Sequence, residues 1–289
     1  DSGSGKRDHR DFALWKLAKP GEPSWESPWG DGRPGWHIEC SAMSLNHFGE
    51  QFDIHGGGHD LRFPHHEAEI FQSECCTGCE PVVGYWMHNG FVNVDGEKMS
   101  KSLGNFWTVR EAFEDHAPLA LRYALLSVPY RNPIDLTPEF LQDAVIHYER
   151  LVEAYSTSLS SDSDSGVDLS DYSQRLTDAM NDDFNTRAAI IEIQAVVSQN
   201  PGRDVASWFE KYAGDVLGLL PSSDEVLAGR AEAESARADI ADRVEGLLKE
   251  RETARQTKNW NRADEIRDEL NSIGVIVEDG LDGPTWRLA

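Results

Sequence analysis

The sequence predicts an α/β domain, then a helical bundle, then a small α+β module. Strand-like runs alternate with glycines and a helix-starting proline in the first third. From residue 108 onward apolar residues recur at the three-to-four spacing of helices. Near the end, two β-branched runs bracket a segment rich in Gly, Asp and Pro. We place the three domains at 1–107, 108–225 and 231–289.

The α/β part begins with a segment, 1–35, whose glycines, prolines and charges are typical of an insertion that returns to a core. A short strand is predicted over 52–55, before the glycine turn Gly56-Gly57-Gly58. Proline favours the first helical position, so a helix is predicted from Pro64. A further strand is predicted within 82–94.

The bundle has one strong helix start, Thr137-Pro138-Glu139, in which Thr137 caps the helix and Pro138 enters its first turn. Residues 156–171 are acidic and rich in serine, which predicts a link between helices, and two or three helices are predicted over 172–220. The residues expected on the buried face of the first helix are Phe140, Leu141, Ala144, Val145, Tyr148, Leu151 and Val152.

The terminal module is predicted to contain a long charged helix over 231–257 and a shorter one over 259–273. In the shorter helix Ala263, Ile266 and Leu270 share a face, and Gly274 suits the residue after its C-terminus. Residues 275–277 and 285–287 then predict a small hairpin.

The composition limits the classes of protein to which the chain can belong. The 289 residues are 39% apolar, which is typical of a globular chain, and no apolar run approaches the roughly 18 residues of a membrane span. Three of the four cysteines fall within residues 75–79, unlike a disulfide framework, so we expect a reducing cytoplasm. The polar first residues do not suggest a signal peptide.

The charge balance is strongly acidic, with 51 Asp and Glu against 27 Lys and Arg and a net charge of −24. Such a balance argues against a nucleic-acid partner in general. An acidic surface poor in lysine is also typical of proteins that work at high salt, where self-repulsion is screened. We therefore interpret the chain as halophilic, and local arginine placement has to decide RNA binding.

The most specific motif is Lys98-Met99-Ser100-Lys101-Ser102. Two lysines with interleaved serines on a loop can wrap a triphosphate and stabilise a leaving pyrophosphate. A looser pattern would indicate only a solvated surface loop. We predict that Lys101 contacts ATP and that Lys98 assists it. Upstream, Gly58 allows a close approach of the backbone to a nucleotide, and the Asp60 carboxylate can accept hydrogen bonds from ribose hydroxyls.

A second constellation combines Cys40 with His65 and Glu69. The last two are four residues apart and so lie on one face of the predicted helix. A thiolate, an imidazole and a carboxylate form a plausible zinc set that leaves a position open for substrate. Alternatives are a cysteine that fills the core and a His–Glu contact on a helix surface. His66, three residues before Glu69, is the rival ligand to His65.

Together these segments resemble the cysteinyl-tRNA synthetase family of class I aminoacyl-tRNA synthetases. The resemblance implies the second half of a Rossmann-type catalytic domain, and a chain truncated at its N-terminus before Asp1. A His-x-Gly-His motif and a fourth, cysteine zinc ligand would precede it. Family members ligate L-cysteine to tRNA(Cys) through a cysteinyl-adenylate, with ATP and Mg²⁺. The segments that carry the resemblance are 34–40, 53–60, 63–69 and 98–105.

The resemblance also implies roles for individual residues. One zinc ion per chain would be held by Cys40, His65 and Glu69, and would select the soft thiolate of cysteine over the hydroxyl of serine. Trp36 and His37 would line the substrate pocket. The family does not require the Cys76-x-x-Cys79 pair, which alone is weak evidence for a second metal.

The terminal module carries the candidate tRNA contacts Arg255, Trp260, Asp264 and Asp279. An arginine, a stacking tryptophan and carboxylates can read unpaired anticodon bases. The alternative is an ordinary charged helix with a capping tryptophan. We expect a monomer that binds tRNA(Cys), ATP and L-cysteine and no membrane.

Two rival functions remain at this point. A cysteine:amino-sugar ligase of mycothiol biosynthesis would share the zinc and lysine motifs but should lack the module at 231–289. A non-catalytic RNA-binding or zinc structural protein derived from a synthetase is the other alternative, and the expected truncation before Asp1 keeps it open.

Overall fold

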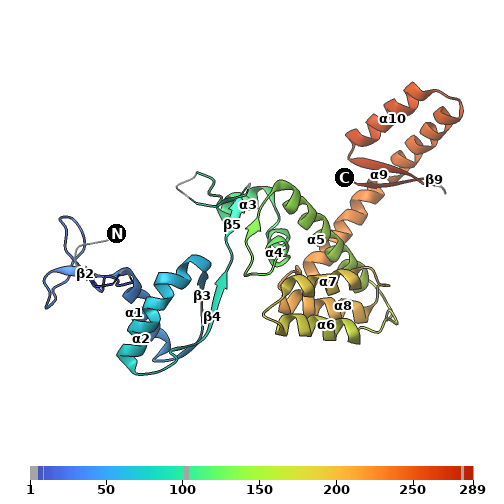
Figure 1. The fold of residues 1–289 in the computed structure, drawn as a ribbon. Coiled ribbons are helices and arrows are strands. Elements are labelled where there is room, and N and C mark those ends of the chain that lie inside the picture. Colours follow the sequence, from blue (N-terminus) through green and yellow to red (C-terminus); the bar gives the residue numbers. More distant parts are fainter. Residues whose placement is uncertain (1–5, 9, 95, 101–103, 281–282, 289) are drawn as a thin grey trace. The chain divides into compact units, whose positions relative to one another are not determined.

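The computed structural model describes residues 6–8, 10–94, 96–100, 104–280 and 283–288. The chain forms two compact units, Asp1–Leu151 with Asp168–Ser198, and Val152–Val167 with Gln199–Ala289. Mixed strands and helices come first, helices follow, and a two-stranded sheet ends the chain (Figure 1). The predicted order of an α/β part, a helical part and an α+β module is confirmed. None of the helices in the described part of the chain is long and apolar enough to cross a membrane.

The first segment holds more regular structure than predicted. Strand β1 (Trp15–Leu17) pairs antiparallel with β2 (Gly32–Pro34). Helix α1 (Trp36–Phe48) follows and was not predicted. Its N-terminal neighbour Gly35 offers no side-chain cap, so the usual start signal is absent from the sequence. A Cβ at Gly35 would stand 1.8 Å from the carbonyl oxygen of Ala13, so glycine is needed for this close approach.

The sheet beside α1 consists of two parallel strands, β3 (Phe52–Gly58) and β4 (Val83–Asn89). Helix α2 (Glu67–Thr77) forms part of the connection between them and packs against α1, as Figure 1 shows. The predicted strand over 52–55 is confirmed but extends further. Gly56, Gly57 and Gly58 pair with Met87, His88 and Asn89, so the prediction of a glycine turn was wrong.

The connection from β3 to α2 corrects a second prediction. After a single 3₁₀ turn, His59–Leu61, residues Arg62–His66 form an irregular helical turn, and α2 itself begins at Glu67 and not at Pro64. Phe63 is extended at φ −138° and ψ 134° because a residue before proline avoids the α region. His66 is already helical at φ −65° and ψ −35°, so His65 and Glu69 still share one face.

A small second sheet follows. Strand β5 (Val92–Val94) pairs antiparallel with β6 (Glu97–Lys98) and parallel with β7 (Ile134–Asp135). The strand predicted within 82–94 is thus two strands, interrupted at Gly90. A Cβ there would stand 2.2 Å from the carbonyl carbon of Asn132. Helices α3 (Val109–Asp115) and α4 (Pro118–Leu126) connect β6 to β7.

The helical part contains α5 (Pro138–Leu159), α6 (Ser170–Asn181), α7 (Thr186–Val197) and α8 (Arg203–Phe209), which continues into a wide helical turn over Glu210–Val216. The predicted start of α5 is confirmed. The link predicted from residue 156 begins only after Leu159, because the 3-4 spacing of apolar residues continues to that point. In the first unit α6 packs on α7, and Leu176 of α6 and Ile190 and Ile193 of α7 are buried.

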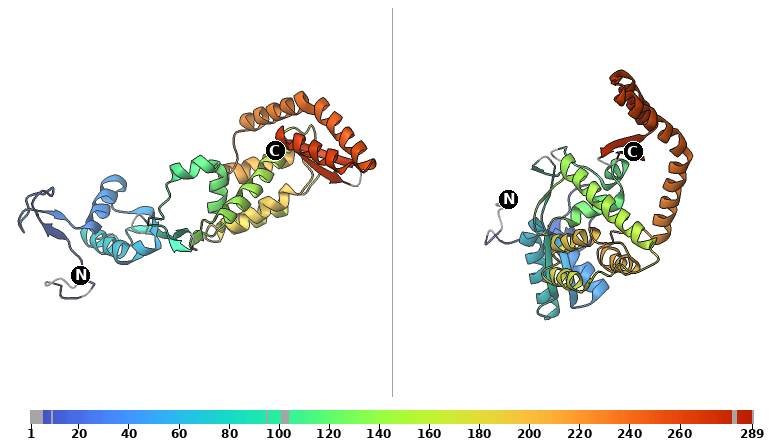
Figure 2. Two further views of the ribbon diagram at one scale, coloured as in Figure 1. Left: turned by 90° about the horizontal axis from the view of Figure 1, so that it is seen from above. Right: turned by 90° about the vertical axis from the view of Figure 1, so that its right-hand side faces the viewer.

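The terminal module consists of α9 (Ser223–Gln256), α10 (Trp260–Ser272), β8 (Val275–Gly280) and β9 (Gly283–Leu288). Helix α9 begins earlier than the predicted residue 231. The cause is a capping box, in which Ser222 and Glu225 each accept from the other's backbone N–H. Asn259 caps α10, and α10 lies alongside α9 (Figure 2).

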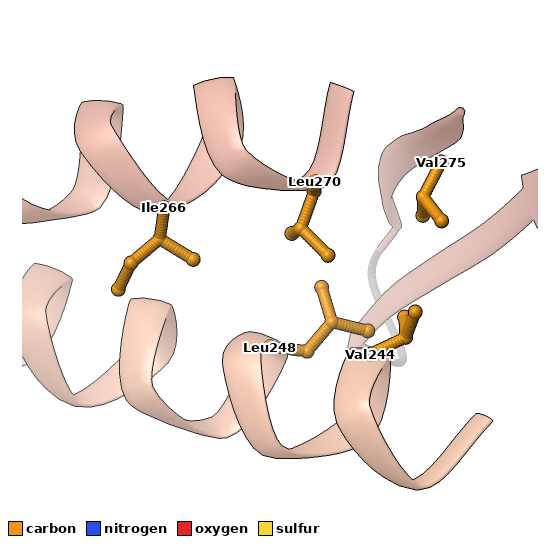
Figure 3. Packing of buried hydrophobic residues seen from close by; sticks show 5 residues of the cluster. All are labelled: Val244, Leu248, Ile266, Leu270 and Val275. Atoms are coloured by element: carbon orange, nitrogen blue, oxygen red, sulfur yellow. The ribbon is translucent and has the colours of Figure 1, made fainter. Parts of the chain in front are cut away.

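One hydrophobic cluster in the described part of this module has five buried residues, and their side chains point toward one another in Figure 3. They come from three elements, which pack the two helices and the hairpin into one body. The predicted inward face of α10 is confirmed by buried Ala263, Ile266 and Leu270. The five residues are Val244, Leu248, Ile266, Leu270 and Val275.

Candidate metal and substrate site

Helix α1, the irregular turn Arg62–His66 and helix α2 bring Cys40, His65 and Glu69 into one group. One candidate ligand atom from each of the three lies within 4.8 Å of the others. The His65 Nε2 atom is 2.7 Å from Glu69 Oε1 and 3.5 Å from Cys40 Sγ. His65 and Glu69 are only 4% and 3% exposed, and Cys40 is half-buried. Three residues predicted from separate motifs therefore converge in space.

The oxygens of Glu69 supply a test of whether this group fits a metal. Among the residues that the structure describes, buried Oε1 accepts no hydrogen bond, although it lies 2.7 Å from a ring nitrogen. An unsatisfied buried carboxylate oxygen is costly. A cation bound by Oε1, the ring nitrogen and the Cys40 sulfur would satisfy all three, and zinc takes this combination of ligands. The residues present fit a zinc ion.

The tautomer of His65 is coupled to that of His37. The two Nδ1 atoms are 2.7 Å apart, so one of them carries the proton and the other accepts it. If His65 donates from Nδ1, its Nε2 presents a lone pair to Cys40 and Glu69, as a metal ligand must. Trp36 stacks on the His65 ring, with centroids 4.4 Å apart and planes 24° from parallel. His37 and Trp36 thus hold the orientation of His65.

The electrostatics of the group favour neutral side chains. Burial raises the pKa of Glu69 to about 7 and lowers the pKa of His65. Burial, with a contribution from Glu69, raises the pKa of the Cys40 thiol. A divalent cation would reverse these preferences for the acids, because its charge favours the carboxylate and the thiolate.

A second group of three shares Glu69. His55, His66 and Glu69 also have candidate atoms within 4.8 Å of one another, and His55 Nε2 is 3.4 Å from Glu69 Oε2. His66 points its Nδ1 at His88 Nε2, 2.8 Å away, and does not join the Cys40 group. The geometry therefore favours His65 over His66 as the partner of Cys40.

Sequence reasoning missed three aromatic or imidazole side chains on the sheet. His55 stacks on Trp86 at 4.7 Å between centroids, and Trp86 lies parallel to His88. His55 and Trp86 are register partners in β3 and β4, while Trp86 and His88 alternate along β4 and so share a face. The alternation Trp86-x-His88 in a predicted strand was the available signal.

Two predicted nucleotide contacts lie close together. The Lys98 ammonium is 3.0 Å from Asp60 Oδ2 and stands over the Phe91 ring at 4.0 Å. The hydrogen bond from Lys98 lowers the pKa of the Asp60 carboxyl. Gly58 lies two residues before Asp60, and a Cβ on it would come within 2.7 Å of the Asp60 carboxylate. Lys101 lies outside the described residues.

The predicted tRNA contacts belong to the terminal module. Arg255 lies in the last turn of α9, Trp260 begins α10 and Asp264 follows one turn later. Trp260 is 58% exposed, which leaves its ring face available for stacking. Asp279 lies in β8, on the hairpin. The structure thus gathers the first three around one helix–helix turn.

Comparison with known proteins adds an independent observation. Residues 1–146 match the family model of the class I (C) tRNA synthetase catalytic domain, which is half of the chain. The chain belongs to the class I tRNA synthetases. Residues 237–287 match a second model, the cysteinyl-tRNA ligase anticodon binding domain.

Curated relatives of this class I synthetase chain include cysteine–tRNA ligases. Those of Laribacter hongkongensis and Azotobacter vinelandii are 48% and 49% identical to it over 98% and 100% of the chain. The chain spans 62% and 63% of their lengths. A solved LeuRS of Agrobacterium radiobacter K84, in a complex with tRNA, has a TM-score of 0.48 and 18% identity, over 71% of this chain and 30% of its own.

Proposed function

We propose that this chain is part of an enzyme that ligates L-cysteine to tRNA(Cys) in two steps, with ATP and a cysteinyl-adenylate. The observation that carries the proposal is the convergence of Cys40, His65 and Glu69 around a carboxylate oxygen without a hydrogen bond. Membership of the class I synthetases and the relatives named cysteine–tRNA ligase support the same substrate.

The three residues would hold one zinc ion per chain. When bound, the ion would take the substrate thiolate as a soft ligand and so separate cysteine from serine. An apolar pocket alone discriminates such near-isosteres only by about 10²-fold. His37 would fix the tautomer of His65, and the Trp36 ring would limit its rotation.

Asp60, Lys98 and Lys101 would bind ATP with its Mg²⁺. The Lys98–Asp60 ion pair is half exposed, so solvent screening makes it weak and easily opened. Opening it would release the Asp60 carboxylate for ribose hydroxyls and the Lys98 ammonium for phosphate oxygens. Lys98 and Lys101 would then offset the charge that develops on the leaving pyrophosphate.

The terminal module would read the anticodon through Arg255, Trp260, Asp264 and Asp279. Support comes from the match of residues 237–287 to an anticodon binding domain, and from the exposed ring of Trp260 at the helix–helix turn. The same match disfavours the amino-sugar ligase, which has no anticodon to read.

The test measures cysteine-dependent exchange of pyrophosphate into ATP, and charging of tRNA(Cys), with the protein that carries these residues. Cys40→Ser should lower both activities and the bound zinc together. Cys79→Ser is the matched control, because Cys79 is also a half-buried free cysteine and lies outside the group. If the protein catalyses cysteine-dependent pyrophosphate exchange but transfers cysteine to an amino-sugar and not to tRNA, the result would favour the rival ligase. Unchanged zinc and activity in Cys40→Ser would refute the zinc assignment.

A further inference from the structure

We propose that a pocket of the first unit, next to the candidate metal group, binds a phosphate oxyanion. The pocket has a volume of about 480 Å³ and lies among the 3₁₀ turn after β3, helix α2, strand β4 and Arg131. That volume falls in the range of small-molecule sites, about 300–1,000 Å³. It is lined by His59, Arg62, His66, Glu67, Ile70, Trp86, His88 and Arg131.

The donor groups of the lining suit an anion. The lining holds two guanidinium groups, Arg62 and Arg131, and one carboxylate, Glu67, and the charge of Arg131 is balanced by Asp183. Within the described part of the chain no ion pair neutralises Arg62. Arginine presents a rigid fork of N–H donors that suits phosphate oxygens. A pocket with this lining therefore favours a phosphate ligand.

Arg131 is held in place from outside the pocket. Its Nη2 donates to Asp183 Oδ1 at 2.9 Å, its Nε donates to the other carboxylate oxygen, and the Tyr130 hydroxyl donates to Asp183 Oδ1 at 2.9 Å. Two of the five N–H groups are used in this way, which leaves three for a ligand. Asp183 has a left-handed φ of 54°, a conformation that aspartate tolerates better than most residues.

Three imidazoles, those of His59, His66 and His88, also line the pocket. His66 and His88 are joined by a hydrogen bond of 2.8 Å between Nδ1 and Nε2. The plane of the Trp86 ring is 5° from that of the His88 ring, and the two ring centroids are 6.4 Å apart. His59 directly precedes Asp60, which places the pocket beside the proposed nucleotide site. The ligand class is a phosphate group, supplied either by a mobile phosphate compound or by an RNA backbone.

The first experiment titrates the chain with inorganic pyrophosphate in a calorimeter. Arg62→Gln should weaken binding at least about tenfold, because it removes the guanidinium for which the described residues supply no counter-ion. Arg110→Gln is the matched control, an exposed arginine on α3 whose replacement changes the net charge equally. Equal affinities of the wild type and Arg62→Gln, or loss of all binding in Lys98→Ala instead, would overturn the proposal.

A second variant guards against misfolding and identifies the source of the phosphate. Arg131→Gln should weaken pyrophosphate binding while its circular dichroism stays that of the wild type; unchanged affinity in this folded variant would count against the pocket. A single-stranded RNA oligonucleotide is then added to the complex. If the RNA displaces pyrophosphate from the wild type, and Arg62→Gln abolishes this competition, the pocket binds an RNA phosphate. If RNA and pyrophosphate bind at the same time, the pocket binds a mobile phosphate compound. Pyrophosphate is also the leaving group of the proposed ligase reaction, and the comparison of Arg62→Gln with Lys98→Ala separates this pocket from the proposed nucleotide site, so failure of one proposal can be told from failure of the other.

Discussion

Replacement of His37 by alanine should weaken zinc binding without removing a ligand. His37 lies behind His65, on the side away from Cys40 and Glu69, and its Nδ1 is 2.7 Å from His65 Nδ1. With His37 present, His65 can keep its proton on Nδ1 and leave Nε2 free for the metal. Without it, the buried Nδ1–H has lost its acceptor, and the tautomer with the proton on Nε2 competes with metal binding.

The expected size follows from the role of such partners. Loss of the residue that orients a ligating histidine typically lowers metal affinity about 10–100-fold. That corresponds to about 1.4–2.8 kcal/mol of binding free energy. His37→Asn should recover much of the affinity, because the asparagine side-chain oxygen stands near the position of Nδ1 and can accept the same proton.

The assay is competition for zinc against a chromogenic chelator of known affinity, with pyrophosphate exchange measured in parallel. His47→Ala serves as the control, since His47 lies exposed in the last turn of the same helix α1. A His37→Ala protein that keeps wild-type zinc affinity would refute the tautomer argument. An equal loss in His37→Asn would show that packing, and not the hydrogen bond, supports the site.

Three further outcomes are expected. Leu270→Ala should cost about 2–5 kcal/mol of unfolding free energy in denaturant titration, because Leu270 is fully buried in the terminal module, and a loss under 1 kcal/mol would contradict that packing. Ser222→Ala should cost about 1 kcal/mol by removing the cap of α9, and an unchanged melting curve would argue against the capping box. Trp260→Ala should reduce charging of tRNA(Cys) but not pyrophosphate exchange, and an equal loss in both assays would deny the residue a role in anticodon reading.

The parts of the fold that the sequence predicted well carry local signals. Thr137 and Pro138 indicate the start of helix α5, and α10 combines the cap Asn259 with a regular apolar face. Helix α1 has neither a polar cap nor a clear apolar stripe, and its helical state depends on packing against α2. The early start of α9 at Ser222 was overlooked although its capping box is visible in the sequence.

The candidate site also has contacts that follow from local spacing and contacts that depend on tertiary packing. The pairing of His65 with Glu69 follows from helical spacing alone, and the structure places them 2.7 Å apart. The approach of Cys40 depends on how α1 packs on α2, which no local pattern encodes; the resemblance to a family was needed to include it. The contact of His37 with His65 was not predicted either, because a hydrogen bond between rings on different elements leaves no trace in residue spacing.

The triple glycine of β3 gains a physical explanation from the two adjacent histidines. Neighbouring residues on a helix point about 100° apart, so His65 turns toward Cys40 while His66 turns toward β4 and His88. The His66 ring then lies against the backbone of β3, where a Cβ at Gly57 would stand 2.9 Å from its Cε1 atom. Glycine is therefore needed at this position because the His66 imidazole packs against it, and not because the chain turns there. One helical turn of the chain thereby supplies His65 to the candidate metal group and His66 to the proposed phosphate pocket. A side chain at Gly57 would displace His66 from the phosphate pocket while leaving the contacts of His65 in the metal group.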